Sequence, residues 1–229
     1  MKFISTTHTG FVRNENQDYL GDLKTESGHI FIVCDGIGGL PKGALASRVA
    51  VESILSDFSG SIDDPKNILQ QSLSNAHQNV YKASNKLIGT TVTALYLEKG
   101  TAFVAWCGDS RIYQFQDHRI KWMSRDHNVL HDILNRGKGK GDVFQNPQAI
   151  TRFLGRTESH QPEFFKFHVN IGDIVLLCSD GLHRFIMEPE IIQTTSNFPL
   201  LTASDMLEKR LLSEEVGAPD NFTWYIIHI

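Results

Sequence analysis

The sequence predicts a protein of the α+β class, and three observations lead to this prediction. Seven short segments are rich in β-branched and aromatic residues and are bounded by turn residues, as strands are. Four other segments carry apolar residues at helical spacing. Two of these helices follow an early strand, more strands come next, and a late helix precedes the final strand. We therefore expect sheets that are covered by helices.

The predicted strands are the β-branched or aromatic-rich runs of the chain. In chain order they span residues 29–34, 91–98, 101–107, 111–115, 164–169, 173–178 and 222–229. Turn residues such as Lys99-Gly100 and Gly172-Asp173 break the pattern between neighbouring strands. Because the connections at 98–101 and 169–173 are short, we expect an antiparallel hairpin at each of them.

The predicted helices begin after a glycine-rich loop. Apolar residues that would share one face of the first helix are Leu45, Val49, Ile54 and Phe58. Those of the second helix are spaced three and four apart, at Leu69, Leu73, Ala76, Val80, Ala83 and Leu87. Asp64-Pro65 just before it are suited to the N-cap and the first helical position. Further helices are predicted over 129–134, ending near Gly137, and over 206–216.

Length and composition describe one globular domain over residues 1–229, with 41% apolar residues and no evident repeat or interdomain linker. A net charge of −4 argues against nucleic acid as a main partner. The first residues lack the apolar core of a signal peptide, and no apolar run approaches the roughly 18 residues that span a membrane. We therefore expect a cytoplasmic protein without membrane insertion. Three cysteines without CxxC spacing argue against a disulfide framework or a zinc knuckle.

Aspartates recur where the predicted strands end or begin. Asp35, Asp109 and Asp180 follow apolar runs, Asp220 precedes the last strand, and Asp18 lies in "RNENQD". A single aspartate at such a position is usually a turn former, but the repeated "CDG", "CGD" and "CSDG" favour one shared site. Two unit charges about 4 Å apart repel by roughly 4 kcal/mol at an effective dielectric near 20. A divalent cation would reverse that repulsion, and oxygen ligands without a His or Cys pattern indicate Mg²⁺ or Mn²⁺.

Arg13 lies five residues before Asp18, in "GFVRNENQD". A lone arginine of this kind is more often a surface cation. Beside a cluster of metal-binding carboxylates, however, a bidentate donor completes a site that can hold a phosphoryl group.

At this point the chain resembles the metal-dependent Ser/Thr protein phosphatases (PPM, the type 2C phosphatases) in their compact bacterial form. The matching segments run in family order along nearly the whole sequence: "TGFVRNENQD", "CDGIGGLPKGALAS", "GTTVTAL", "CGDSRIY", "SRDH", "ITRFLG", "LLCSDGL" and "DNFTW". The resemblance implies a four-layer α-β-β-α sandwich, in which two mainly antiparallel sheets pack face to face with helices on both outer faces. It also implies a flap at about 137–150, where the sequence has a glycine-rich, charged segment.

The resemblance further implies two Mn²⁺ or Mg²⁺ ions at one end of the sandwich. Asp35 would bridge both ions and the Gly36 carbonyl would bind one of them. Asp180 and Asp220 would bind the other ion.

Four further residues receive roles from the same resemblance. Asp18 would lie close to the metals, largely through metal-bound waters, with Gln17 alongside. Asp109, together with Asp180, matches the family's weaker third metal position. Arg13 would hold the phosphate.

The implied reaction hydrolyses phosphoserine and phosphothreonine on proteins without a covalent intermediate, by attack of a water between two cations roughly 3.5–4 Å apart. The implied partners are phosphoproteins and an opposing bacterial Ser/Thr kinase, and the implied state is a monomer. Position 37 is Ile, where eukaryotic members carry a histidine proposed to protonate the leaving group. The general acid is therefore not identified, and His183 has no assigned role.

Two other functions are compatible with the same sequence. The same fold could bind phosphoproteins without turnover, as a pseudophosphatase, or act on a small phosphorylated metabolite. Cys178 and Arg184 have the C-x5-R spacing of cysteine phosphatases, but Asp180 between them would repel a thiolate and a phosphate. The glycine loop at 36–43 matches neither the Walker A pattern nor the G-x-G-x-x-G pattern of nucleotide-binding proteins. His127 in "SRDHN" is expected to be structural.

Overall fold

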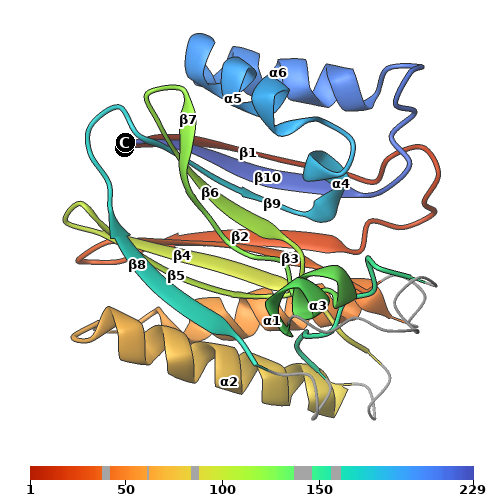
Figure 1. Ribbon diagram of the computed structural model, residues 1–229. Coiled ribbons are helices and arrows are strands. Elements are labelled where there is room, and N and C mark those ends of the chain that lie inside the picture. The colour runs from red at the N-terminus through yellow and green to blue at the C-terminus, as the bar shows by residue number, and fades with distance from the viewer. Residues whose placement is uncertain (38–41, 61, 84–87, 137–145, 156–160) are drawn as a thin grey trace.

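The computed structural model describes residues 1–37, 42–60, 62–83, 88–136, 146–155 and 161–229. Within these ranges the chain forms two five-stranded sheets (Figure 1). One sheet has the spatial order β1 (Lys2–His8), β10 (Phe222–His228), β9 (Ile174–Cys178), β6 (Arg111–Gln116) and β7 (Arg119–Met123). The other has the order β2 (Asp18–Lys24), β3 (His29–Asp35), β4 (Val92–Glu98), β5 (Thr101–Cys107) and β8 (Glu163–His168). Every pair of neighbouring strands is antiparallel.

Helices cover the outer face of each sheet, so that the predicted four-layer α-β-β-α sandwich is confirmed (Figure 1). The helices α1 (Gly43–Asp57) and α2 (Pro65–Ala83) pack on the β2–β8 sheet, and α5 (Glu188–Asn197) and α6 (Leu200–Leu211) lie over the other one. Two short helices, α3 (Val129–Arg136) and α4 (Asp180–His183), lie at one end of the sandwich. Among the described residues no helix is both long and apolar enough to cross a bilayer.

The core consists of three layers of apolar side chains, one between the sheets and one under each helical layer. Alternate residues of β3 enter different layers: Ile30 and Ile32 pack toward α1 and α2, whereas Phe31 and Val33 pack between the sheets. A strand that is buried on both faces reads as a continuous apolar run. That run explains why β3 was predictable, and it carries Asp35 to the edge of the core.

All seven predicted strands are present, with bounds that differ by a residue or two. The strands that the sequence did not predict are β1, β2 and β7, and each of them is an edge strand of the described sheets. Their side chains are largely exposed or half-exposed, so they lack the apolar run of an inner strand. The helix α5 was also not predicted.

Two predictions of local structure are wrong. The segment 169–173 does not close a hairpin, because β8 belongs to one sheet and β9 to the other, and the short connection crosses between them. The late helix spans Leu200–Leu211 rather than 206–216, and a turn follows it in which Ala218 N–H bonds Leu211 O. Leu87 and the flap residues 137–145 lie outside the described residues.

Candidate active site

The five predicted aspartates lie where strand ends of both sheets meet. Asp18 and Asp35 are directly opposite one another in the β2–β3 pairing. Asp180 begins α4 immediately after β9, Asp220 precedes β10, and Asp109 lies in the connection from β5 to β6. A pocket of about 320 Å³ opens beside them, lined by Arg13, Gln17, Asp35, Gly36, Ile37, Gln148, Ala149, Ile150, Phe153, Asp180, Arg184, Asp220 and Asn221. The convergence that the sequence predicted is therefore present.

Hydrogen bonds from neighbouring threonines fix the backbone of Asp35. Its carbonyl accepts hydrogen bonds from Thr91 N–H at 2.8 Å and Thr90 Oγ1 at 2.9 Å, and its N–H donates to Thr91 Oγ1 at 3.0 Å. Burial, followed by the charges of Asp18 and Asp180, raises the pKa of the Asp35 carboxyl well above its usual range. The charged form is thus unfavourable without a cation nearby.

Asp18 lies deeper in the site. Ser179 Oγ donates to Asp18 Oδ2 at 2.7 Å, while Oδ1 is buried and has no hydrogen-bond partner in the described part of the chain. Burial raises the pKa of Asp18 to about 7. A buried acceptor without a donor is unusual and needs an explanation. A divalent cation that takes oxygen ligands would supply one, so the donor set fits Mg²⁺ or Mn²⁺.

Arg13 reaches the same pocket and pairs with Asp220. Its Nε lies 2.8 Å from Asp220 Oδ1 and its Nη2 lies 2.9 Å from Oδ2, which is a bidentate geometry. The Arg13 side chain is 46% exposed, at the rim of the pocket. The predicted phosphate-binding arginine and a predicted metal ligand are therefore each other's partners.

Asp109 and Asp180 share a second arginine, Arg184. Nη2 of Arg184 lies 2.5 Å from Asp109 Oδ2, and Nη1 lies 2.8 Å from Asp180 Oδ2. Burial raises the pKa of both carboxyls, to about 7 for Asp109, and Arg184 opposes that rise. His183, whose role the sequence left open, donates from Nε2 to the Asp109 carbonyl at 2.9 Å.

Ion pairs with two different arginines separate Asp220 from Asp109 and Asp180. In the residues that the structure describes, no three His, Cys, Asp or Glu side chains are gathered into a group that could hold a metal ion. Asp220 is bonded to Arg13, while Asp109 and Asp180 are bonded to Arg184. The carboxylates are nevertheless close enough to raise one another's pKa. The site thus has the donors for metal, arranged around two arginines.

Glycine is required at position 36, next to the central aspartate. A Cβ there would lie 2.5 Å from the Gly43 backbone and 2.8 Å from Gln17 O. The Gly36 N–H donates to the same Gln17 carbonyl at 3.0 Å. Gly36, Gln17 and Ile37 all line the pocket, and Ile37 offers no proton there. Sequence and structure agree that position 37 holds no general acid.

Asn221 is a site residue that sequence reasoning missed. Its Nδ2 donates to Thr9 O at 2.7 Å and to Glu15 O at 3.0 Å, and its Oδ1 accepts from Gln17 N–H at 2.9 Å. These bonds hold the loop that carries Arg13 against the start of β10. The only available signal was its place beside Asp220 in "DNFTW", because a polar amide before a strand is usually solvated.

The rival cysteine site is not supported. Cys178 is fully buried in the core beneath α5 and α6, and burial raises the pKa of its thiol above the ordinary value. A thiolate nucleophile needs a lowered pKa and access. Arg184 of the same C-x5-R spacing is bonded to the two aspartates instead.

His127 has the structural position expected of it. Its Nδ1 accepts a hydrogen bond from Gly108 N–H at 3.1 Å, and its ring stacks on Trp106 with centroids 6.2 Å apart. Of the predicted flap, residues 148–150 line the pocket.

Comparisons with known proteins identify phosphatases that resemble this chain in sequence and in fold. A sequence model of the protein phosphatase 2C family matches residues 12–213. The serine/threonine phosphatase stp of Listeria monocytogenes is 27% identical over 246 residues, which cover 96% of this chain and 93% of that protein. The serine/threonine phosphatase Stp1 from Staphylococcus aureus superposes with a TM-score of 0.88 at 25% identity, covering 100% of this chain and 94% of that one. The catalytic domain of the phosphatase PstP, solved in complex with two manganese ions, shares the fold with a TM-score of 0.82 at 22% identity, over 98% of this chain and 96% of its own.

Proposed function

The chain belongs to the protein phosphatase 2C family, and we propose on this basis that it is a metal-dependent protein phosphatase that acts on phosphoserine and phosphothreonine. The observation that carries the proposal is the paired arrangement of Asp18 and Asp35 beside an arginine-rimmed pocket. Asp18 is buried and half-buried Asp35 lies directly opposite it, and within the described residues one oxygen of Asp18 has no donor, so this pairing of like charges is costly unless a cation joins them.

Asp35, the Gly36 carbonyl, Asp180 and Asp220 would hold two Mn²⁺ or Mg²⁺ ions, with Asp18 close by. Bound divalent ions of this kind acidify water and neutralise charge that develops on a phosphoryl group. Neighbouring residues of the chain hold the carboxylates that would bind these ions. The Thr90 and Thr91 bonds hold the Asp35 backbone, and Ser179 holds one oxygen of Asp18.

Arg13 would orient the phosphate. Nε and Nη2 are used by Asp220, and Nη1 is not part of that pair. If Asp220 served as a metal ligand, the planar Arg13 guanidinium would be available for two phosphate oxygens. The Asn221 bonds to the 9–17 loop would keep Arg13 in place during this exchange.

The substrate class rests on the relatives, among them named serine/threonine phosphatases from bacteria. We further propose a monomeric cytoplasmic enzyme that opposes a bacterial Ser/Thr kinase. Comparison of phosphate release with Mn²⁺ and with Mg²⁺ would show which ion supports activity.

The test is phosphate release from a phosphothreonine peptide by purified protein, with Mn²⁺, with Mg²⁺ and with EDTA. Release is expected with metal only, and Asp35→Asn should abolish it. Asp205→Asn, an exposed carboxylate on α6, is the matched control and should keep full activity.

Two other outcomes would select the alternatives. A folded protein that binds Mn²⁺ but releases no phosphate from any substrate would be a phosphoprotein-binding module. Release from small phosphate esters but not from phosphopeptides would indicate a metabolite phosphatase.

A further inference from the structure

Arg184 occupies the corner of the site that the family resemblance assigns to a weak third metal. That position was expected to use Asp109 and Asp180. In the structure the guanidinium of Arg184 bonds both carboxylates, at 2.5 Å and 2.8 Å. The carboxylates thus already share a cation, and the chain itself provides it.

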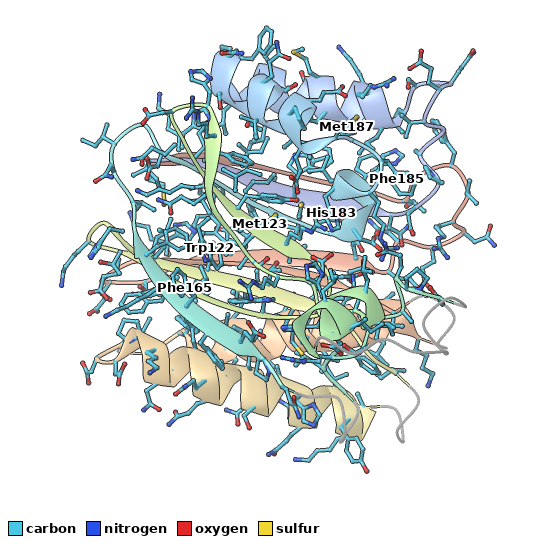
Figure 2. The ribbon with its side chains drawn as sticks, in the orientation of Figure 1. Trp122, Met123, Phe165, His183, Phe185 and Met187 are labelled. Carbon is cyan, nitrogen blue, oxygen red and sulfur yellow. The ribbon has the colours of Figure 1, made fainter. Side chains whose placement is uncertain are left out.

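Hydrogen bonds to the backbone hold Arg184 and Asp109 in place. Arg184 follows α4 directly, and its N–H donates to the Asp180 carbonyl at 3.0 Å. His183 donates to the Asp109 carbonyl, so that two consecutive residues hold Asp109 at its backbone and at its side chain. Figure 2 labels His183 and Phe185, the neighbours of Arg184, at α4, at the end of the sandwich that carries the carboxylates.

The close packing of α4 on β10 leaves this corner little room to adjust. A Cβ at Gly181 would lie 1.8 Å from the Asn221 carbonyl oxygen, so only glycine allows this approach. The Asp109 residue is 1% exposed. The guanidinium is therefore held between two carboxylates whose backbones are tied down.

A third divalent cation would meet a fixed positive charge here. Oδ1 of Asp109 has no hydrogen-bond partner within the described ranges, and it belongs to the same carboxylate as the oxygen bonded to Arg184. Burial lowers the pKa of Arg184, but the charges of Asp180 and Asp109 more than offset that effect, and an arginine does not give up its proton. A cation on Oδ1 would thus lie within a few ångströms of the guanidinium.

We propose that Arg184 is a built-in cation that replaces the third metal, so that this phosphatase binds two metal ions and not three. Arg184 is then a positioning residue: it holds Oδ2 of Asp180 and leaves Oδ1 for a metal. The inference rests on the proposed two-metal function, and it predicts a metal stoichiometry that activity alone would not reveal.

The experiment is a calorimetric titration of the metal-free, full-length protein with Mn²⁺ into the millimolar range. Wild type should bind two ions. Arg184→Asp replaces the guanidinium with a third carboxylate at the same corner and should gain a third, weaker ion. Arg184→Lys keeps the charge and should still bind two.

The matched control is Arg48→Asp, which makes the same change of charge at an exposed position on α1 and should bind two ions. Circular dichroism checks that each variant is folded. A wild type that binds three ions would overturn this inference and leave the proposed function intact. A wild type that binds none would overturn both. A folded Arg184→Asp that stays at two ions would also contradict the inference. The wild-type stoichiometry decides the matter even if a variant does not fold.

Discussion

Two arginines pair with candidate metal ligands in this site, and they do so in different surroundings. The Arg13–Asp220 pair lies at the rim, with side chains 46% and 24% exposed. The Arg184 side chain is 33% exposed, but its partners Asp109 and Asp180 are 1% and 11% exposed. Both arginines bind carboxylates, Arg13 one and Arg184 two, but water has more access to the carboxylate at the rim than to the two buried ones.

The difference predicts which pair can be exchanged. A solvent-exposed ion pair contributes about 0–1 kcal/mol, because water solvates both partners when they separate. Removing one partner of a buried pair costs about 3–5 kcal/mol, because the other charge remains buried and unpaired. We therefore expect Asp220 to release Arg13 readily, which would free Asp220 for the proposed metal and Arg13 for phosphate, whereas Asp109 should retain Arg184. The rim pair is a switchable contact and the buried pair is part of the scaffold.

The largest expected effect is that of a substitution at Asp35, which lines the pocket together with both arginines. Asp35→Asn should lower kcat by about 10³-fold or more, because it removes the central proposed metal ligand and the electrostatic stabilisation that would depend on it. Without metal the variant should be at least as stable as wild type. The raised pKa of Asp35 means that its charge disfavours the folded state at neutral pH, and the neutral amide removes that charge.

Phosphate release and thermal unfolding in EDTA measure the two parts of this prediction. Turnover at the wild-type rate would contradict the metal site. A large loss of stability in EDTA would contradict the like-charge repulsion.

Arg184→Ala tests the buried pair. Asp109 would be left buried without its cation, and the free energy of unfolding should fall by about 3 kcal/mol, at the lower end of the range for broken buried pairs because Asp109 can take up a proton. Urea unfolding of the metal-free protein measures the change. A loss below 1 kcal/mol would mean that the two pairs do not differ as proposed.

Arg13→Ala tests the exposed pair in the same assay. Its free energy of unfolding should change by less than about 1 kcal/mol. Its KM for a phosphothreonine peptide should rise by about tenfold or more, because the variant loses charge-assisted hydrogen bonds to phosphate that contribute roughly 1.5 kcal/mol or more each. The Kd for Mn²⁺ should change less than KM. An unchanged KM would remove the role in phosphate binding.

The smallest effect is expected at Cys178. Cys178→Ala should keep kcat and KM within about twofold, because the thiol is buried beneath α5 and α6 and does not line the pocket. Steady-state kinetics with the same peptide check this. A complete loss of activity in a folded variant would revive the cysteine nucleophile.

The strands show how far prediction from the sequence extends. All six inner strands were predicted, because burial on both faces demands continuous apolar runs. Of the edge strands in the described sheets, only β8 was predicted, since its "FFKF" is aromatic. The strands β1, β2 and β7 were missed because each has only one neighbouring strand and largely exposed side chains.

Sequence reasoning alone predicted one site for Arg13 and the five aspartates, because each aspartate lies at an element end and all six residues lie in family-like segments. The aspartates are Asp18, Asp35, Asp109, Asp180 and Asp220. The arginine partner of each aspartate was not predictable and depends on the folded arrangement of the chain. Arg184 is 75 residues from Asp109 along the chain, and it reaches that carboxylate because α4 packs against β10 at Gly181. Ion-pair partners depend on distance and on exclusion of water, and neither quantity is encoded in local sequence.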